Sequence, residues 1–160
     1  MCEYCGCRSV PAIRELMEEH DAILEDAHDV RAALGSGDRA ETVARLQHLT
    51  AHLAPHVHRE EVGIFAALRE QGDWADEVSQ LEGEHQDLDS AITDIDPLEA
   101  SFDRRVLTLL ESLEEHIERE NLGIFPVSVV TLGAPGWDTV AEAHRQTPTF
   151  LPADGPQPVT

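Results

Sequence analysis

Apolar residues recur every three or four positions along most of the chain, the spacing that places them on one face of a helix. Between residues 11 and 34 this stripe consists of Ile13, Leu16, Met17, Ile23, Leu24, Ala27, Val30 and Leu34. Ser9 is a candidate N-cap, Pro11 suits a first helical turn, and a Gly-Ser-Gly sequence follows Leu34. The pattern therefore predicts a long first helix.

Capping residues and periodicity together predict the next two helices. Asp38 and Glu41, three residues apart, form a capping-box pattern. The helix that they begin should run to about residue 70, and Pro55 should bend it. A turn at residues 71–73 precedes a third helix, from about residue 74 to 93, with a similar apolar stripe.

The sequence Asp96-Pro97-Leu98-Glu99 is another capping pattern, with proline at the first helical position. It predicts a fourth helix that runs to about residue 122. Gly123 and Pro126 should end or distort this helix.

Beyond the fourth helix we expect a helical turn at residues 127–132, a short helix at 138–145, and a proline-rich tail that is disordered or lies on the surface. Four long helices joined by short loops predict an all-α, up-down-up-down four-helix bundle with a short C-terminal helix. The expected division is a Cys-containing N-terminal segment (1–10), the bundle (11–132), and a loop, short helix and tail (133–160).

The net charge of the chain argues against two classes of binding partner. Its 160 residues carry a formal net charge of -21, which argues against nucleic acid and anionic membrane, because both attract basic surfaces. No apolar run reaches the roughly 18 residues needed to cross a bilayer. The N-terminus lacks the pattern of a signal peptide. We therefore expect a cytoplasmic protein.

The cysteines are clustered: Cys2, Cys5 and Cys7 all lie before residue 8. An odd, clustered set is a poor disulfide framework. The spacing suits a zinc or iron–sulfur centre completed by a ligand from elsewhere, a redox-active thiol set, or an exposed terminus. The sequence leaves these interpretations open.

One stretch of the chain occurs twice. Residues 53–65 read L-A-P-H-V-H-R-E-E-V-G-I-F, and residues 113–125 read L-E-E-H-I-E-R-E-N-L-G-I-F. Leu16-x-x-Glu19-His20 likewise matches Leu81-x-x-Glu84-His85. Helices one and two thus resemble helices three and four, and a pseudo-twofold axis should relate the two halves.

The repeat selects six candidate metal ligands. Helical residues four apart lie on one face about 5–6 Å apart, so each His-x-x-x-Glu pair can chelate an ion. An isolated pair of this kind is often an ordinary surface contact, but here Gly, Ile and Phe recur at fixed offsets behind both pairs. Each half adds a lone histidine, and the inward-facing set is His20, His56, Glu60, His85, His116 and Glu120.

Six ligands exceed the four of a tetrahedral zinc site. Two glutamates that each bridge two ions would leave two imidazoles for each ion, and this donor set suits iron, manganese or zinc. Two divalent ions facing two carboxylates favour an additional oxide or hydroxide bridge. His52, one turn before His56, is a further candidate, either as a ligand or as a hydrogen-bond partner of one.

These residues resemble the hemerythrin-like, or HHE cation-binding, domain family over about residues 11–126. The resemblance rests on His20, His56-x-x-x-Glu60, His85, His116-x-x-x-Glu120, the repeated E-x-x-G-I-F and the Phe125-Pro126 that follows. It implies a non-heme di-iron centre, with two Fe ions held by these six residues, that binds O₂ or reacts with peroxide, nitric oxide or cellular iron.

The chain departs from the oxygen-carrying hemerythrins in two places. Their second histidine on helix three is replaced here by Leu81 or Asp89, and helix four has His-x-x-x-Glu instead of His-x-x-x-x-Asp. Both departures argue against a simple oxygen carrier. We expect a di-iron protein that binds or reacts with O₂, peroxide or a related small oxidant. The alternative is an iron-, oxygen- or redox-sensing regulator without catalytic turnover.

Overall fold

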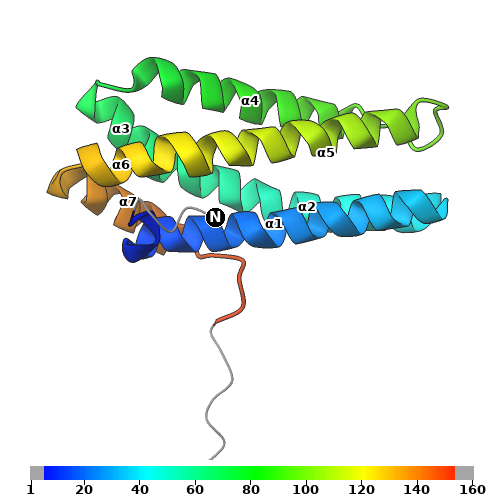
Figure 1. The fold of residues 1–160 in the computed structure, drawn as a ribbon, viewed down its shortest axis with the longest axis horizontal. Coiled ribbons are helices and arrows are strands. Elements are labelled where there is room, and N and C mark those ends of the chain that lie inside the picture. Colours follow the sequence, from blue (N-terminus) through cyan, green and yellow to red (C-terminus); the bar gives the residue numbers. More distant parts are fainter. Residues whose placement is uncertain (1–5, 154–160) are drawn as a thin grey trace, which may run out of the picture.

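A computed structural model describes residues 6–153, and all regular secondary structure in this range is helical. This confirms the all-α prediction. The long helices that lie side by side (Figure 1) are α1 (Pro11–Ser36), α2 (Arg39–Glu60), α4 (Ala75–Thr93) and α5 (Phe102–Arg119). The shorter helices that gather at one end are α3 (Ala66–Gln71), α6 (Phe125–Thr131) and α7 (Ala134–Gln146). A 3-10 turn, η1 (Cys7–Ser9), precedes α1.

Local signals in the sequence explain the ends of several helices. The side chain of Asp38 accepts a hydrogen bond from the backbone N–H of Glu41 at 2.9 Å, as the capping pattern predicts. Gly37 ends α1 with φ 76°, and Gly72 ends α3 with φ 88°. Both glycines adopt the left-handed conformation that other residues rarely tolerate.

Two predicted helix starts were wrong. The fourth long helix starts at Phe102, because the side chain of Asp96 accepts a hydrogen bond from the N–H of Leu98 at 2.8 Å and folds a local turn. The short C-terminal helix begins at Ala134 and not at residue 138, since Pro135 occupies its first turn.

A π-helical turn begins at or directly after the ligand glutamate of each repeat copy. The first, η2 (Glu61–Phe65), joins α2 to α3, and the second, η3 (Glu120–Ile124), joins α5 to α6. The second helix is therefore not a regular α-helix as far as residue 70. Single π turns inside α-helices are frequent at functional sites. Here they bring Phe65 and Phe125 back toward the bundle axis, where both rings are fully buried.

The apolar core is divided into two clusters. One contains Ile13, Leu16 and Met17 with Phe65, Leu81, Phe125 and Val140, and the other contains Ile23, Val30, Leu53, Leu88, Phe102 and Leu113. On each long helix a buried histidine lies in sequence between residues of the two clusters, as His20 does between Met17 and Ile23. A layer of buried polar groups therefore separates two apolar ends.

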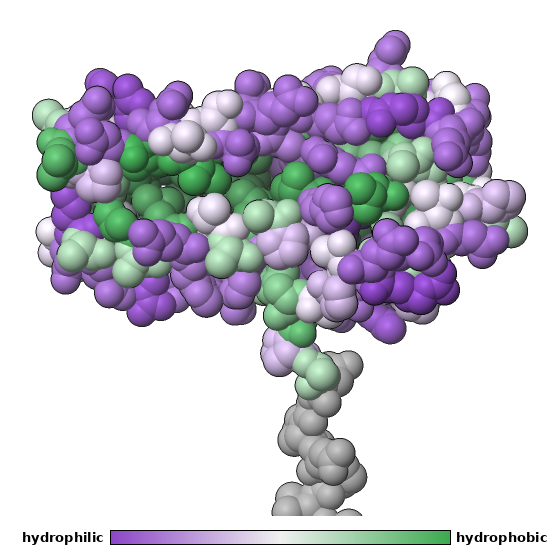
Figure 2. Space-filling view, turned by 180° about the vertical axis from the view of Figure 1, so that it is seen from behind, coloured by the Kyte–Doolittle hydropathy of each residue, from purple (hydrophilic) through white to green (hydrophobic). Residues whose placement is uncertain are grey.

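The outer surface is strongly hydrophilic. Seen from behind, hydrophilic residues cover most of the molecule, and a hydrophobic band runs between them (Figure 2). Among residues 6–153 there is no helix with the length and apolar character of a membrane span.

Candidate metal centre

The structure brings the six residues selected from the sequence into one layer of the bundle. All are buried, and their exposed fractions run from 0% for Glu60 and Glu120 to 5% for His85. Each long helix contributes: α1 supplies His20, α2 supplies His56 and Glu60, α4 supplies His85, and α5 supplies His116. Glu120 begins the second π turn, η3.

Their donor atoms form two groups, one in each half of the layer. The first group contains His20, His56, Glu60 and Glu120, and the second contains His85, His116 and Glu120; within each group the donor atoms lie within 4.8 Å of one another. Nε2 of His85 is also 3.5 Å from Oε2 of Glu60. Each carboxylate therefore faces both groups, one oxygen toward each.

The other ring nitrogen of each histidine is held by a neighbouring helix. Nδ1 of His56 lies 2.7 Å from a carboxylate oxygen of Glu19, and Nδ1 of His116 lies 2.7 Å from Glu84. Glu19 and Glu84 occupy equivalent repeat positions, so the two contacts correspond. Such outer contacts fix the ring orientation and leave Nε2 facing inward.

The Nδ1 atoms of the lone histidines, His20 and His85, also contact side chains from other helices, but the two contacting groups differ chemically. Nδ1 of His20 lies 3.0 Å from the side-chain oxygen of Asn121. Nδ1 of His85 lies 3.0 Å from a carboxylate oxygen of Glu61. One lone histidine therefore faces a neutral amide and the other a carboxylate.

A phenylalanine ring stacks on each lone histidine. Phe125 lies 5.4 Å from His20 between ring centroids, and Phe65 lies 5.6 Å from His85, both nearly parallel. Each phenylalanine directly follows or ends a π turn. These rings close the centre on the side of the short helices and exclude water there.

Charges within the layer stabilise one another. Burial alone would lower the pKa of His20, but the carboxylates of Glu120 and Glu60 raise that pKa to about 10. The same carboxylates raise the pKa of His85 to about 11 against the effect of its burial. Burial acts to raise the pKa of both glutamates, yet contacts with the histidines lower it below the usual range.

Several buried atoms in the layer lack a well-aligned hydrogen-bond partner within the described part of the chain. They are Nε2 of His20, His56, His85 and His116 and both carboxylate oxygens of Glu60 and Glu120. Burying so many polar atoms without well-aligned hydrogen bonds is costly unless something else binds them. Imidazole nitrogens and carboxylate oxygens are ligands for iron, manganese and zinc, so the donor set fits a pair of cations.

The sequence predicted only some of the residues that contact the six candidate ligands. The repetition of Glu19 and Glu84 beside the lone histidines was only a weak signal, consistent with two solvated acids, and did not indicate that each would hold the histidine of the following helix. Nothing in the sequence identified Thr149, whose hydroxyl donates to Glu19 from the C-terminal segment. His52 does not join the six residues, because its Nδ1 lies 2.7 Å from Asp26.

The predicted metal site at the N-terminal cysteines is not supported. Cys7 is fully buried and is part of a disulfide, so its sulfur is not a free thiolate ligand. Cys2 and Cys5 lie outside the described residues.

The surroundings of the centre differ between the two halves. In the first half Arg59 is buried against Glu15 and Glu19, and α7 packs over η2 so closely that a side chain on Gly63 would come within 3.2 Å of Ala143. In the second half the equivalent Arg119 is half exposed beside Glu84.

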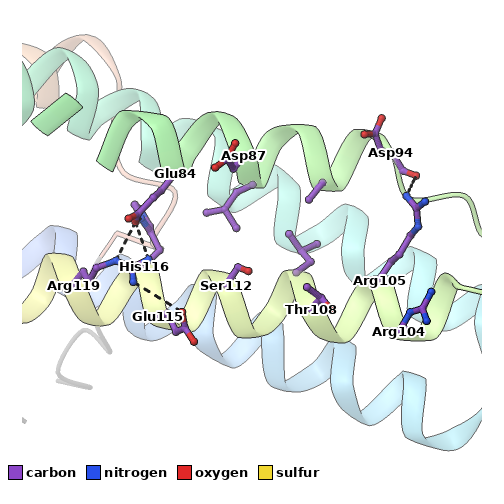
Figure 3. A pocket seen from close by; sticks show the side chains of 13 residues that line it. Glu84, Asp87, Asp94, Arg104, Arg105, Thr108, Ser112, Glu115, His116 and Arg119 are labelled. Atoms are coloured by element: carbon purple, nitrogen blue, oxygen red, sulfur yellow. Dashed lines mark hydrogen bonds and ion pairs between the residues drawn. The ribbon is translucent and has the colours of Figure 1, made fainter. Parts of the chain in front are cut away.

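A groove leads to the second half of the centre. It lies between α4 and α5, has a volume of about 400 Å³, and is lined by Glu84, Ser112, His116 and Arg119 among others (Figure 3). At the equivalent place in the first half, Thr149 contacts Glu19 and the ring of Phe150 stacks on His52. This groove reaches His116, and a second groove of about 320 Å³ between α2 and α4 reaches His85.

Comparison with known families identifies the domain. Residues 12–128 match the family described as the hemerythrin HHE cation binding domain. The match covers most of the chain, which therefore belongs to this family. No match was found among curated proteins or among solved structures.

Proposed function

We propose that the six buried residues bind two iron ions and that the protein binds or reacts with O₂, peroxide or a related small oxidant. The observation that carries this proposal is the set of buried Nε2 and carboxylate atoms that lack well-aligned hydrogen bonds inside an HHE cation-binding domain. In this proposal the long helices form an up-down-up-down bundle, and each half supplies two imidazoles while both glutamates bridge the ions.

Iron bound there supplies the redox chemistry toward the oxidant. The residues of the chain hold and shield it. Glu19, Glu84, Glu61 and Asn121 keep the Nδ1 atoms of the four histidines occupied, so that each Nε2 stays directed at the centre. Phe65 and Phe125 exclude water from one side.

The small ligand approaches, in this proposal, through the groove between α4 and α5. This route ends at His116, where Arg119 lies at the mouth beside Glu84. Among residues 6–153, the C-terminal segment and α7 cover the equivalent place in the first half.

Metal content tests the proposal directly. Aerobically purified protein should contain about two irons per chain, as expected for a paired metal site in a bundle core, and absorb visible light by charge transfer. His56→Ala combined with His116→Ala should abolish iron loading, whereas His28→Ala combined with His58→Ala, both exposed, should not. Wild-type protein that gains no iron on anaerobic reconstitution would contradict the proposal.

A redox- or iron-sensing role is the second candidate. It is favoured by the contact of Thr149 with Glu19, because Glu19 also holds His56 and so joins the centre to the C-terminal segment. Turnover separates the two candidates. Consumption of many equivalents of peroxide or O₂ per protein would indicate an enzyme, and a single stoichiometric reaction would favour the sensor.

A further inference from the structure

A second cluster of potential metal ligands lies outside the buried layer. It consists of Asp26 on α1 and His48 and His52 on α2. Nε2 of His48 is 3.4 Å from Oδ1 of Asp26, and Nδ1 of His52 is 2.7 Å from Oδ2 of the same carboxylate. The carboxylate therefore lies between two imidazoles.

The helical repeat explains why these histidines diverge from the buried layer. His48, His52 and His56 are four residues apart, and four residues turn a helix by about 400°, so each histidine is rotated by about 40° from the next. Their side chains are accordingly 56%, 26% and 2% exposed. His48 and His52 face α1, where Asp26 meets them.

We propose that Asp26, His48 and His52 form a separate site for a single divalent transition-metal ion such as Zn²⁺. The donor atoms all lie within 4.8 Å of one another. Two donors bound at about 2.1 Å to a tetrahedral ion are about 3.4 Å apart, the separation found between His48 and Asp26. His52 and Asp26 are closer, at 2.7 Å, and this hydrogen bond would give way to the ion on binding. Two imidazoles with one carboxylate favour zinc and its neighbours over calcium or magnesium.

The stacking of Phe150 holds one of the ligands in place. Its ring lies 4.3 Å from that of His52 between centroids, with an angle of 9° between the planes. The rings of His48 and His52 are themselves 4.4 Å apart and meet edge to face. A ligand that is already oriented loses less entropy when an ion binds.

The internal repeat does not produce a second copy of this cluster. At the equivalent positions the second half has Ala91, Thr108 and Ser112, which line the open groove between α4 and α5. None of these three side chains supplies an imidazole or a carboxylate. The second site therefore belongs to the first half only, and its existence does not depend on the proposed iron centre.

Zinc titration of the iron-loaded protein tests the site. Isothermal titration calorimetry should show one zinc ion bound per chain, while the visible absorption reports that iron stays in place. Loss of an outer contact to a metal ligand already costs about 10–100-fold in affinity, so His48→Ala, which removes a ligand, should weaken zinc binding by at least about 100-fold. Asp26→Asn should do the same with little change in size.

His28→Ala, which removes an exposed histidine from α1, is the matched control and should bind zinc as the wild type does. Equal zinc affinity in wild type, His48→Ala and Asp26→Asn would overturn the proposal. So would a wild-type protein that binds no zinc. If the protein holds no iron, the comparison of wild type with His48→Ala still decides the zinc site separately.

Discussion

Asn121 and Glu61 occupy equivalent positions in the two repeat copies, and each holds the lone histidine of the opposite half. Asn121 meets Nδ1 of His20, and Glu61 meets Nδ1 of His85, both at 3.0 Å. A carboxylate partner makes an imidazole a stronger electron donor than an amide partner does. The ligands of the two halves are nearly symmetric, but their hydrogen-bond partners are not, because one half has Asn121 where the other has Glu61.

We predict that this difference makes the two iron ions inequivalent. Glu61→Gln should weaken iron binding by about tenfold or more and make the two iron environments more alike. Chelator competition would measure the first effect and Mössbauer spectra the second. Glu118→Gln, which removes the same charge from an exposed position, should change neither. An unaltered spectrum in Glu61→Gln would show that the outer contact does not act on the iron.

Metal loading should release protons. Because the pKa of His20 is raised to about 10 and that of His85 to about 11, both imidazoles carry a proton at neutral pH before a cation binds. Iron competes with these protons, so loading at pH 7 should release at least two, and the apparent affinity should increase as the pH rises. Titration in buffers of different ionisation enthalpy measures the number. Loading without proton release would contradict the assigned charges.

His144 should make stability depend on pH. Burial and the nearby Arg59 lower the pKa of this histidine to about 4, whereas an unfolded histidine has a pKa of about 6.5. Between these values the unfolded chain binds more protons, so the free energy of unfolding should rise with pH from about 4 to 6.5. Urea denaturation across this range should give a shallower rise for His144→Gln. The exposed His28→Gln should retain the wild-type slope.

The two repeat glycines should respond differently to alanine. A methyl group at Gly63 would come within 3.2 Å of the Ala143 side chain, while nothing lies within 4 Å of the same position at Gly123. Gly123→Ala should be neutral or stabilising, because alanine is preferred in helices by up to about 1 kcal/mol. Gly63→Ala adds a close contact that costs about 1 kcal/mol or more. Denaturant midpoints would contradict this if Gly63→Ala were the more stable variant.

The groove between α4 and α5 should control access. Ser112 is exposed within it, so Ser112→Trp should fill it and slow the binding of azide, a small anionic ligand for iron, by about tenfold. Stopped-flow absorbance on the iron-loaded protein measures the rate. Leu107→Trp, on the same helix but not lining the groove, is the control. Unchanged azide binding in Ser112→Trp would mean that ligands enter elsewhere.

Periodicity and repetition in the sequence were sufficient to predict the helices and to select six residues that the structure brings together. The features that they could not predict depend on alternative hydrogen bonds of one side chain and on contacts between different helices. Asp96 could cap a helix or close a turn, and only its contact with Leu98 decides between them. His52 pairs with Asp26 on the preceding helix, a contact that no spacing within one helix indicates.

The C-terminal segment was the least predictable part of the site. Its proline content predicted a tail that is disordered or lies on the surface, but not that Thr149 would contact Glu19 or that Phe150 would stack on His52. Both contacts join residues about 100 or more positions apart in the chain, so they depend on the folded bundle and leave no local pattern in the sequence.

The paired π turns bear on the origin of the domain. A π turn arises when a helix accommodates one extra residue without breaking, and each turn begins at or directly after the ligand glutamate of its repeat copy and contains the Gly-Ile pair. Two independent insertions at matching places would be a coincidence. If one helix pair was duplicated to form the domain, that ancestral pair already carried the extra residue, and two such pairs associating face to face would have been the earlier form of the protein.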